Sequence, residues 1–138
     1  MEYALSNDSI SIKVSTAGGS FTSIEADGRE YLWQGDPTVW SGQAPICFPI
    51  CGGLRDNSAM TFAGHHVKLA RHGFARKQEW KLLSQGENEL AMCLASEDNA
   101  ALLSDYPYPF KLVARYTLED TAVRVSYEVT NEGTEDMP

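Results

Sequence analysis

The 138-residue sequence lacks the features of several functional classes. No apolar run is long enough to span a bilayer, and the first residues form no signal peptide, so we expect no membrane span and no export. Only eleven lysines and arginines stand against nineteen acidic residues, and the net charge of −8 argues against nucleic acid or an anionic membrane as partner. Three cysteines cannot all pair, so a reduced, cytoplasmic setting is the simplest expectation.

Motifs of nucleotide and serine chemistry are also absent. The sequence has no phosphate-cradling loop, no GxGxxG run and no GxSxG elbow, which disfavours nucleotide binding and serine hydrolysis. What is present is the composition of an ordinary folded domain, with 43% hydrophobic and 22% charged residues. At this length we expect one domain with a buried core.

The hydrophobic pattern predicts β-strands joined by short turns. Ile10, Ile12 and Val14 alternate with polar residues, which is the period of a half-buried strand. Asp27-Gly28 lies between two further strand-like runs. This dipeptide predicts a two-residue hairpin because both residues tolerate the positive φ of a type I′ turn.

Further hairpins are predicted around residues 85–88 and 119–120, with a short helical turn capped by Ser96. Strands do not alternate with helices, so we expect an all-β fold, an antiparallel β-sandwich. Residues 130–138 form an acidic, turn-like stretch from which a sandwich would normally continue into another strand. We therefore expect this chain to be the N-terminal part of a single, incomplete sandwich domain.

Residues 40–76 hold all three histidines, and we expect the chemistry there. His72 is the main candidate, because histidine exchanges protons near neutral pH and the adjacent Gly73 allows close approach of a ligand. The alternative is an exposed histidine at the end of a hairpin. Arg55 follows a glycine turn and can present its donors to a ligand hydroxyl or phosphate, although the pattern alone favours a surface ion pair.

No metal site is expected from the sequence. His65 and His66 are adjacent on a predicted strand, so they point to opposite faces, and their spacing to His72 matches no metal-binding motif. Cys47 and Cys51 lie in an apolar run, where cysteine behaves as a small hydrophobic residue. Four residues along a strand would hold these two cysteines too far apart to bridge.

Four short segments together resemble the aldose 1-epimerase (galactose mutarotase) family, and most closely its LacX-like branch. They are YLWQGD at residues 31–36, PICFP at 45–49, GGLRDN at 52–57 and HGFAR at 72–76. The resemblance extends over nearly the whole chain. It implies a galactose mutarotase-like antiparallel sandwich and a reaction that interconverts the α and β anomers of a free hexose without a cofactor.

The resemblance also implies roles for three residues. His72 matches the first of the family's two active-site histidines, which hydrogen-bonds the sugar near its ring oxygen. Arg55 and Arg76 fall where members place arginines that line the sugar pocket, although members often carry the first of these at the position of Gly53. The family's second histidine and its glutamate base have no counterpart here. The chain is therefore expected to bind a hexose and to carry part of the site of a general acid–base isomerase, while being inactive by itself.

Three other readings stay open. A hexose-6-phosphate 1-epimerase would need arginines that converge on a phosphate, for which Arg55, Arg71 and Arg76 are candidates. A non-catalytic carbohydrate-binding sandwich would use tryptophans as a platform for a sugar face. A homodimer would form through an open sheet edge with unpaired backbone groups.

Overall fold

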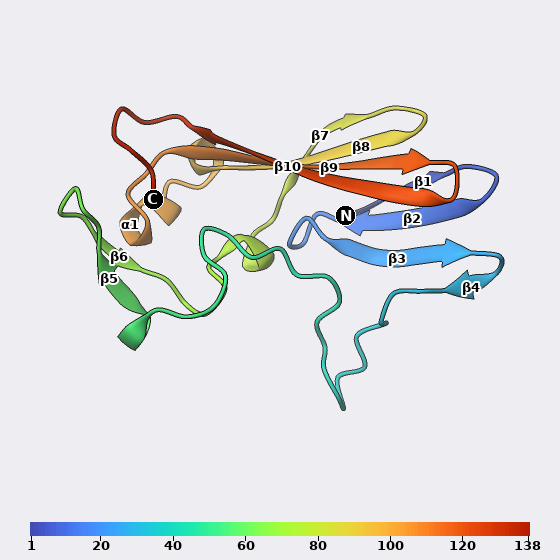
Figure 1. Ribbon diagram of the computed structural model, residues 1–138, viewed down its shortest axis with the longest axis horizontal. Helices are drawn as coiled ribbons and strands as arrows, with labels where there is room; N and C mark the ends of the chain where they lie inside the picture. The colour runs from blue at the N-terminus through green and yellow to red at the C-terminus, as the bar shows by residue number, and fades with distance from the viewer.

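Two antiparallel four-stranded sheets face each other in the computed structural model, which describes residues 1–138 (Figure 1). The first sheet has the order β1-β2-β3-β4, and the second has the order β10-β9-β8-β7. The strands of the first are β1 (Glu2–Ser6), β2 (Ile10–Ser15), β3 (Phe21–Ala26) and β4 (Arg29–Glu30). Those of the second are β7 (Lys81–Gln85), β8 (Glu89–Ala95), β9 (Phe110–Glu119) and β10 (Ala122–Asn131). The expected antiparallel, all-β architecture is confirmed.

The core lies between the two sheets. Ile12 and Val14 of β2 are fully buried, as their alternation predicts. Tyr116 of β9 crosses the core, packs edge-to-face on Phe21 at 4.7 Å between ring centroids, and donates a hydrogen bond to the carbonyl of Gly19. This bond links two segments that are far apart in sequence, and it ties the turn after β2 to the opposite sheet.

The sequence predicts the turn between β3 and β4 correctly, but it misplaces one helix cap and misses one strand. Asp27 and Gly28 have φ of 52° and 69°, as a type I′ turn between β3 and β4 requires. The predicted cap at Ser96 is wrong, because its hydroxyl instead exchanges hydrogen bonds with the backbone of Phe110. Strand β1 was not predicted. It buries only Leu5, so it carries almost no alternation signal.

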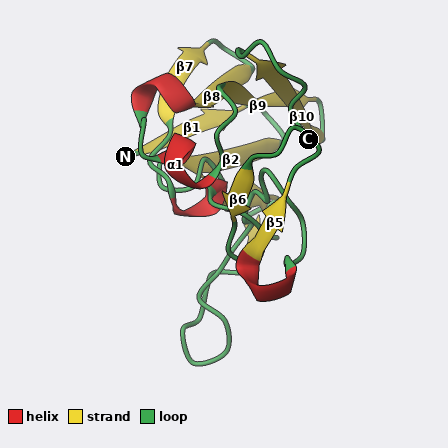
Figure 2. Ribbon diagram, turned by 90° about the vertical axis from the view of Figure 1, so that its left-hand side faces the viewer, coloured by secondary structure: helices red, strands yellow, loops and turns green.

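The remaining elements lie at one end of the sandwich. A small hairpin, β5 (Ser58–Met60) with β6 (His66–Lys68), stands apart from both sheets. Figure 2 shows the long loop of residues 31–54 extending below the sheets. The helical pieces are α1 (Leu102–Asp105) and three 3-10 turns at Arg55–Asn57, Ala75–Lys77 and Ser96–Asp98. None of these helices has the length and apolar character that a membrane crossing requires.

Candidate functional site

The segment that carries His72 is anchored to the sandwich by Trp80. The indole is buried, and its Nε1–H donates to the carbonyl of Ala75 at 3.0 Å. The backbone N–H of Trp80 donates to Thr16 at 2.7 Å, at the end of β2. Gly19 lies against the indole face so closely that an added Cβ would fall 2.5 Å from the ring. The short helical turn that follows His72 is therefore held by a core residue.

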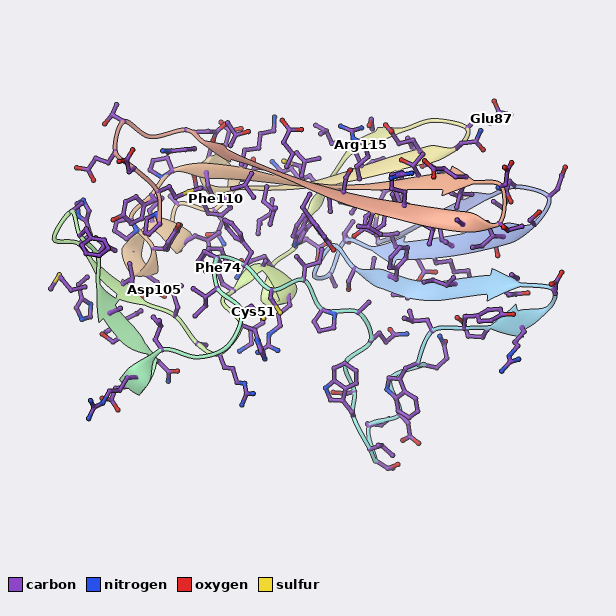
Figure 3. The ribbon with its side chains drawn as sticks, in the orientation of Figure 1. Cys51, Phe74, Glu87, Asp105, Phe110 and Arg115 are labelled. Atoms are coloured by element: carbon purple, nitrogen blue, oxygen red, sulfur yellow. The ribbon has the colours of Figure 1, made fainter.

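Gly73 joins this segment to the irregular run of residues 44–51. It forms a single parallel bridge with Phe48, and the N–H of Phe74 donates to the Phe48 carbonyl at 2.9 Å. Gly73 has φ of +71°, and a Cβ here would lie 2.0 Å from the Phe48 oxygen. Only glycine fits this position. The rings of Phe48, Phe74 and Phe110 pack together behind it, and Figure 3 labels Phe74 and Phe110.

His72 is held by the turn that follows Cys51. Its N–H donates to the Gly52 carbonyl at 2.6 Å, and the N–H of Gly52 donates to ring atom Nδ1 at 2.9 Å. The Nε–H of Arg71 approaches the other ring nitrogen, Nε2, at 3.3 Å. A neutral imidazole accepts at one nitrogen only, and the shorter bond from the backbone decides which. We therefore assign the proton to Nε2, which makes His72 a hydrogen-bond donor away from the turn once the exposed Arg71 side chain, whose Nε–H points at Nε2, turns aside.

Arg76 is bound to the residue before His72, with part of its guanidinium free. One Nη2–H donates to the carbonyl of Arg71 at 2.8 Å. The Nε atom is buried without any hydrogen-bond partner. This nitrogen has no contact with solvent, so the guanidinium can meet a ligand only through its Nη groups. Arg55, in contrast, is exposed, its side chain makes no hydrogen bond or ion pair, and no hydrogen bond joins it to His72 or Arg76.

The other two histidines belong elsewhere. His65 pairs with Glu135 at 2.5 Å, and its ring packs edge-to-face on Tyr108. His66 shares a hydrogen bond with Ser58 at 2.8 Å across the β5–β6 hairpin. The three histidines therefore form no cluster of their own.

Two cysteines lie next to His72, which the sequence pattern did not suggest. The sulfur atoms of Cys47 and Cys51 and one His72 ring nitrogen all lie within 4.8 Å of one another. The expectation that a strand separates these cysteines is wrong, because residues 44–51 form no strand. Burial and the neighbouring Cys51 thiol raise the pKa of Cys47, against the opposing effect of the Arg76 guanidinium. In the sequence, the only hint of this cluster is the short spacing between Cys47 and Cys51.

An apolar cleft of about 380 Å³ borders this cluster. Cys47 and Phe48 form one side, and Tyr127 and Val129 of β10 form the other. Both β10 residues are largely exposed, at 56% and 46% of their surface. The cleft therefore offers an apolar floor beside polar donors, which suits the two kinds of surface that a sugar ring presents.

The tryptophans divide between core and surface. Trp80 is part of the core, whereas Trp33 and Trp40 are about half exposed on the loop that precedes the site. The Nε1–H of Trp33 donates to the carbonyl of Trp40 at 2.8 Å, so the two residues brace the loop.

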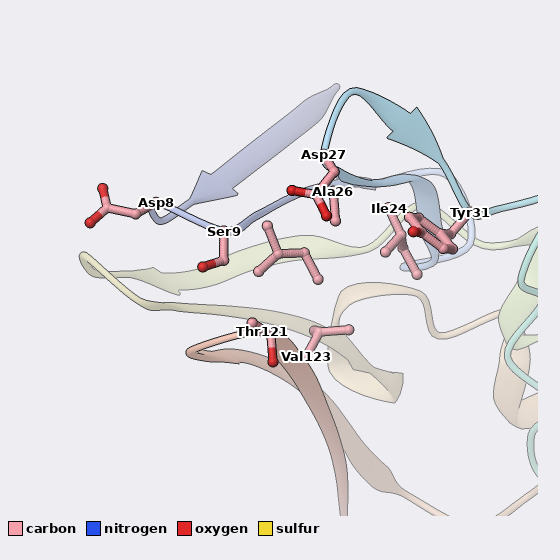
Figure 4. A pocket seen from close by; sticks show the side chains of 9 residues that line it. Asp8, Ser9, Ile24, Ala26, Asp27, Tyr31, Thr121 and Val123 are labelled. Atoms are coloured by element: carbon pink, nitrogen blue, oxygen red, sulfur yellow. The ribbon is translucent and has the colours of Figure 1, made fainter.

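A second cavity, of about 580 Å³, lies near the turns that join β3 to β4 and β9 to β10 (Figure 4). Its polar groups come from Asp8, Ser9, Asp27, Tyr31 and Thr121, and no histidine, arginine or lysine lines it. It therefore lacks a group that protonates oxygen near neutral pH, and we place the candidate site at His72 instead.

Comparison with known proteins gives one consistent result. The family model described as Aldose 1-epimerase matches residues 1–138. Protein LacX of Lactococcus lactis subsp. lactis, in its plasmid and chromosomal forms, is 42% identical over 143 residues, which cover 98% of this chain and 46% of LacX.

Solved structures agree with this match. A galactose mutarotase related enzyme from Lactobacillus acidophilus superposes with a TM-score of 0.92 at 28% identity, covering 99% of this chain and 45% of that one. A galactose mutarotase-like protein from Lactobacillus casei gives 0.92 at 26% identity, covering 99% and 46%. The chain spans about half the length of the relatives it matches, and its fold is galactose mutarotase-like. On these findings the chain belongs to the aldose 1-epimerase family.

Proposed function

We propose that His72 and Arg76 form one wall of a hexose-binding site, in a protein that interconverts the α and β anomers of a free hexose. The observation that carries this proposal is the bond from the Gly52 N–H to His72 Nδ1. It leaves the ring proton on Nε2, where it can be donated to a sugar oxygen. A histidine fixed in one tautomer by the backbone is suited to general acid–base work.

Anomer exchange needs a base that removes one proton and an acid that supplies another. A base takes the proton of the anomeric hydroxyl while the ring oxygen accepts a proton, and the bond between C1 and the ring oxygen breaks. The open carbonyl compound rotates and then closes on either face. Negative charge develops on the ring oxygen as the bond breaks, and an Nε2–H donor from His72 stabilises it there.

Arg76 has a matching role in this proposal. Its Nη groups, anchored by the bond to the Arg71 carbonyl, are the donors for a sugar hydroxyl, because the guanidinium fork presents several N–H groups at once. The base and the second acid belong to the half of the site that this chain does not supply. This agrees with the length of the relatives, which is about twice that of the chain.

Ligand-observed NMR and polarimetry test the proposal. We expect saturation transfer from the protein to galactose or glucose, with a loss in both His72→Asn and Arg76→Gln. Asparagine tolerates the positive φ of His72, so the first variant keeps the backbone. The matched control, His66→Asn, changes a histidine of the β5–β6 hairpin and should leave the transfer unchanged. Equal transfer in wild type and both site variants would refute the proposal.

Polarimetry of freshly dissolved α-glucose separates binding from turnover. We expect the chain alone to bind the sugar without speeding mutarotation appreciably, because only one wall is present. Turnover well above buffer that depends on His72 would show that the chain finds its acid and base elsewhere, for example in a second copy. Binding that persists without turnover after the full site is assembled would favour a non-catalytic carbohydrate-binding protein.

A phosphorylated sugar is the second candidate. The Nε–H of Arg71 points at the His72 ring, and Arg76 is bound to the Arg71 carbonyl. Two guanidinium groups that converge on one ligand suit a phosphate. Glucose 6-phosphate should then displace glucose in the NMR experiment and lose its advantage in Arg71→Gln, whereas a site for free hexose would bind both sugars alike.

A further inference from the structure

We propose that Cys47, Cys51 and His72 form a site for a soft metal ion, with Zn²⁺ as the representative ligand, and that metal and hexose exclude each other there. The metal site stands on its own geometry, whereas the exclusion rests on the function proposed above for His72. This departs from the sequence-based expectation that the chain holds no metal.

The distances between the donor atoms support a metal site. The two sulfur atoms and one ring nitrogen all lie within 4.8 Å of one another. In a tetrahedral zinc site with bonds of about 2.0–2.3 Å, donor atoms are separated by roughly 3.5–3.8 Å. The three side chains therefore need only a small contraction around an ion, and the fourth position stays open to solvent.

The chemistry of the donors selects the metal. Two thiolates and a neutral imidazole are soft and borderline ligands, a set that favours Zn²⁺ or Cu⁺ over Ca²⁺ or Mg²⁺. Cys47 and Cys51 are separated by three residues, which is within the spacing common in metal-binding cysteine pairs. Both thiols are free and accessible to solvent, so an ion can reach them.

The third ligand comes from a distant part of the chain and is already in place. His72 is brought to the cysteines by its two hydrogen bonds with Gly52, the residue after Cys51. These bonds are formed by the backbone, so the histidine does not depend on the metal for its position. The third cysteine, Cys93, lies buried in the second sheet with Ala91, Ala95 and Val113 and is not part of the cluster.

Metal binding must disturb the bond between Gly52 and the ring. At Nδ1 the ion replaces the Gly52 N–H, and at Nε2 the ring proton has to move to Nδ1, where it meets that same N–H. Gly52 can move aside, because its φ is +98° and the space beside its Cα is open. An ion at Nε2 removes the Nε2–H donor that we assign to the sugar, whereas an ion at Nδ1 would leave that proton in place. The exclusion therefore requires coordination through Nε2, and an ion bound there inhibits hexose binding.

Cobalt titration of the reduced chain tests the metal site without using activity. We expect one Co²⁺ per chain, with near-ultraviolet absorption from thiolate-to-metal charge transfer that Zn²⁺ then abolishes. Cys47→Ser and Cys51→Ser should remove this absorption, and His72→Asn should weaken affinity by about a hundredfold or more, since even the residues behind metal ligands matter by 10–100-fold. Because both cysteines are exposed, we expect these variants to fold, and far-ultraviolet circular dichroism checks this.

Two matched variants make the result decisive. Cys93→Ala removes the other thiol, and His66→Asn removes a histidine outside the cluster, and neither should change the titration. The proposal is wrong if no charge-transfer absorption appears while a thiol assay counts three free cysteines. It is equally wrong if Cys93→Ala reduces the signal as much as Cys51→Ser, or if His72→Asn binds cobalt like wild type.

The inhibitory effect has its own measurement. Saturation transfer to hexose should fall as Zn²⁺ is added and return with a chelator, and Cys51→Ser should bind hexose with little response to zinc. Unchanged hexose binding in the zinc-loaded chain would overturn the exclusion. If the chain binds no hexose under any condition, the function proposed above fails, while the cobalt titration still decides the metal site.

Discussion

The sandwich and the segment of residues 45–76, here called the site segment, are built in different ways. Each strand of the sandwich pairs with its neighbour along the chain, and burial of alternating side chains holds the two sheets together. The site segment has only one short hairpin. It is held by single backbone bonds between residues such as Phe48 and Phe74 or Gly52 and His72, several of them in left-handed conformations. We infer that the sandwich tolerates single substitutions because many buried side chains share in stabilising it. The conformation of the site segment, in contrast, depends on a few residues.

Trp80→Ala should have the largest effect, because this residue belongs to both regions. The indole fills the core against Gly19 and its Nε1–H holds Ala75 in the site segment. Loss of a buried tryptophan costs about 3–5 kcal/mol of unfolding free energy, and urea unfolding followed by circular dichroism would measure it. Hexose binding should be lost as well.

Two controls separate the roles of Trp80. Trp80→Phe keeps an aromatic ring in the core but removes one of the two donors to the Ala75 carbonyl, which keeps the Gln78 N–H at 3.1 Å, a cost of about 0.5–1.5 kcal/mol. Trp33→Ala changes a half-exposed indole on the loop and should alter stability far less. If Trp33→Ala destabilises the chain as much as Trp80→Ala, the division into core and site segment is wrong.

Gly73→Ala should damage the site segment and spare the sandwich. Alanine at φ of +71° costs about 1–3 kcal/mol in backbone strain, and its Cβ would meet the Phe48 carbonyl at 2.0 Å. We expect the segment to detach locally, with fast amide hydrogen exchange at Phe74 and Ala75 and loss of hexose binding. Exchange in β8 and β9 should stay slow.

Gly64→Ala is the matched control for this variant. Gly64 also has positive φ, at +84°, but nothing lies within 4 Å of an added Cβ. It should show the strain alone, without opening of the site segment. Equal loss of hexose binding in the two glycine variants would mean that strain, and not the contact with Phe48, controls the site.

The same contrast explains what the sequence could predict. Strand β2 and the turn at Asp27 follow local rules of alternation and positive φ, so both were predicted from a few neighbouring residues. The contact of His72 with Gly52 joins residues twenty positions apart in irregular chain, where no periodicity exists to indicate a partner. For that reason the residue pattern could offer His72 only as a candidate and the resemblance to a family added Arg76, while the place of Cys47 and Cys51 beside His72 came only from the structure.

Glu30→Gln tests an intermediate case, a polar network at the edge of the first sheet. Partial burial raises the pKa of Glu30, but hydrogen bonds from the Ser23 hydroxyl and the N–H groups of Ile24 and Leu32 outweigh it and hold the pKa below its usual value. A lowered pKa in the folded state stabilises the fold above the ordinary glutamate pKa and loses this effect as pH falls through the lowered value.

The expected result is a change in how stability depends on pH under acidic conditions. The urea midpoint of wild type should fall between about pH 5 and pH 3. The midpoint of Glu30→Gln should be lower at pH 7 and should change less over that range. Glu25→Gln, on the neighbouring strand β3, removes a carboxylate that makes no side-chain hydrogen bond and serves as control. A steeper acid limb in Glu30→Gln than in wild type would reverse the sign argued here.

Arg124→Gln should have the smallest effect, although its ion pair has good geometry. Arg124 Nε and Nη2 donate to both carboxylate oxygens of Glu119 at 2.7 and 2.9 Å across the end of the β9–β10 hairpin, and this holds the pKa of Glu119 below its usual value. Both side chains are largely exposed, where water replaces the partner at little cost. We expect no resolvable change in the urea midpoint at pH 7 and none that depends on salt. Strand β9 is set instead by buried residues such as Leu112 and Tyr116, so a midpoint shift as large as that of Glu30→Gln would show that an exposed pair, and not burial, holds this hairpin.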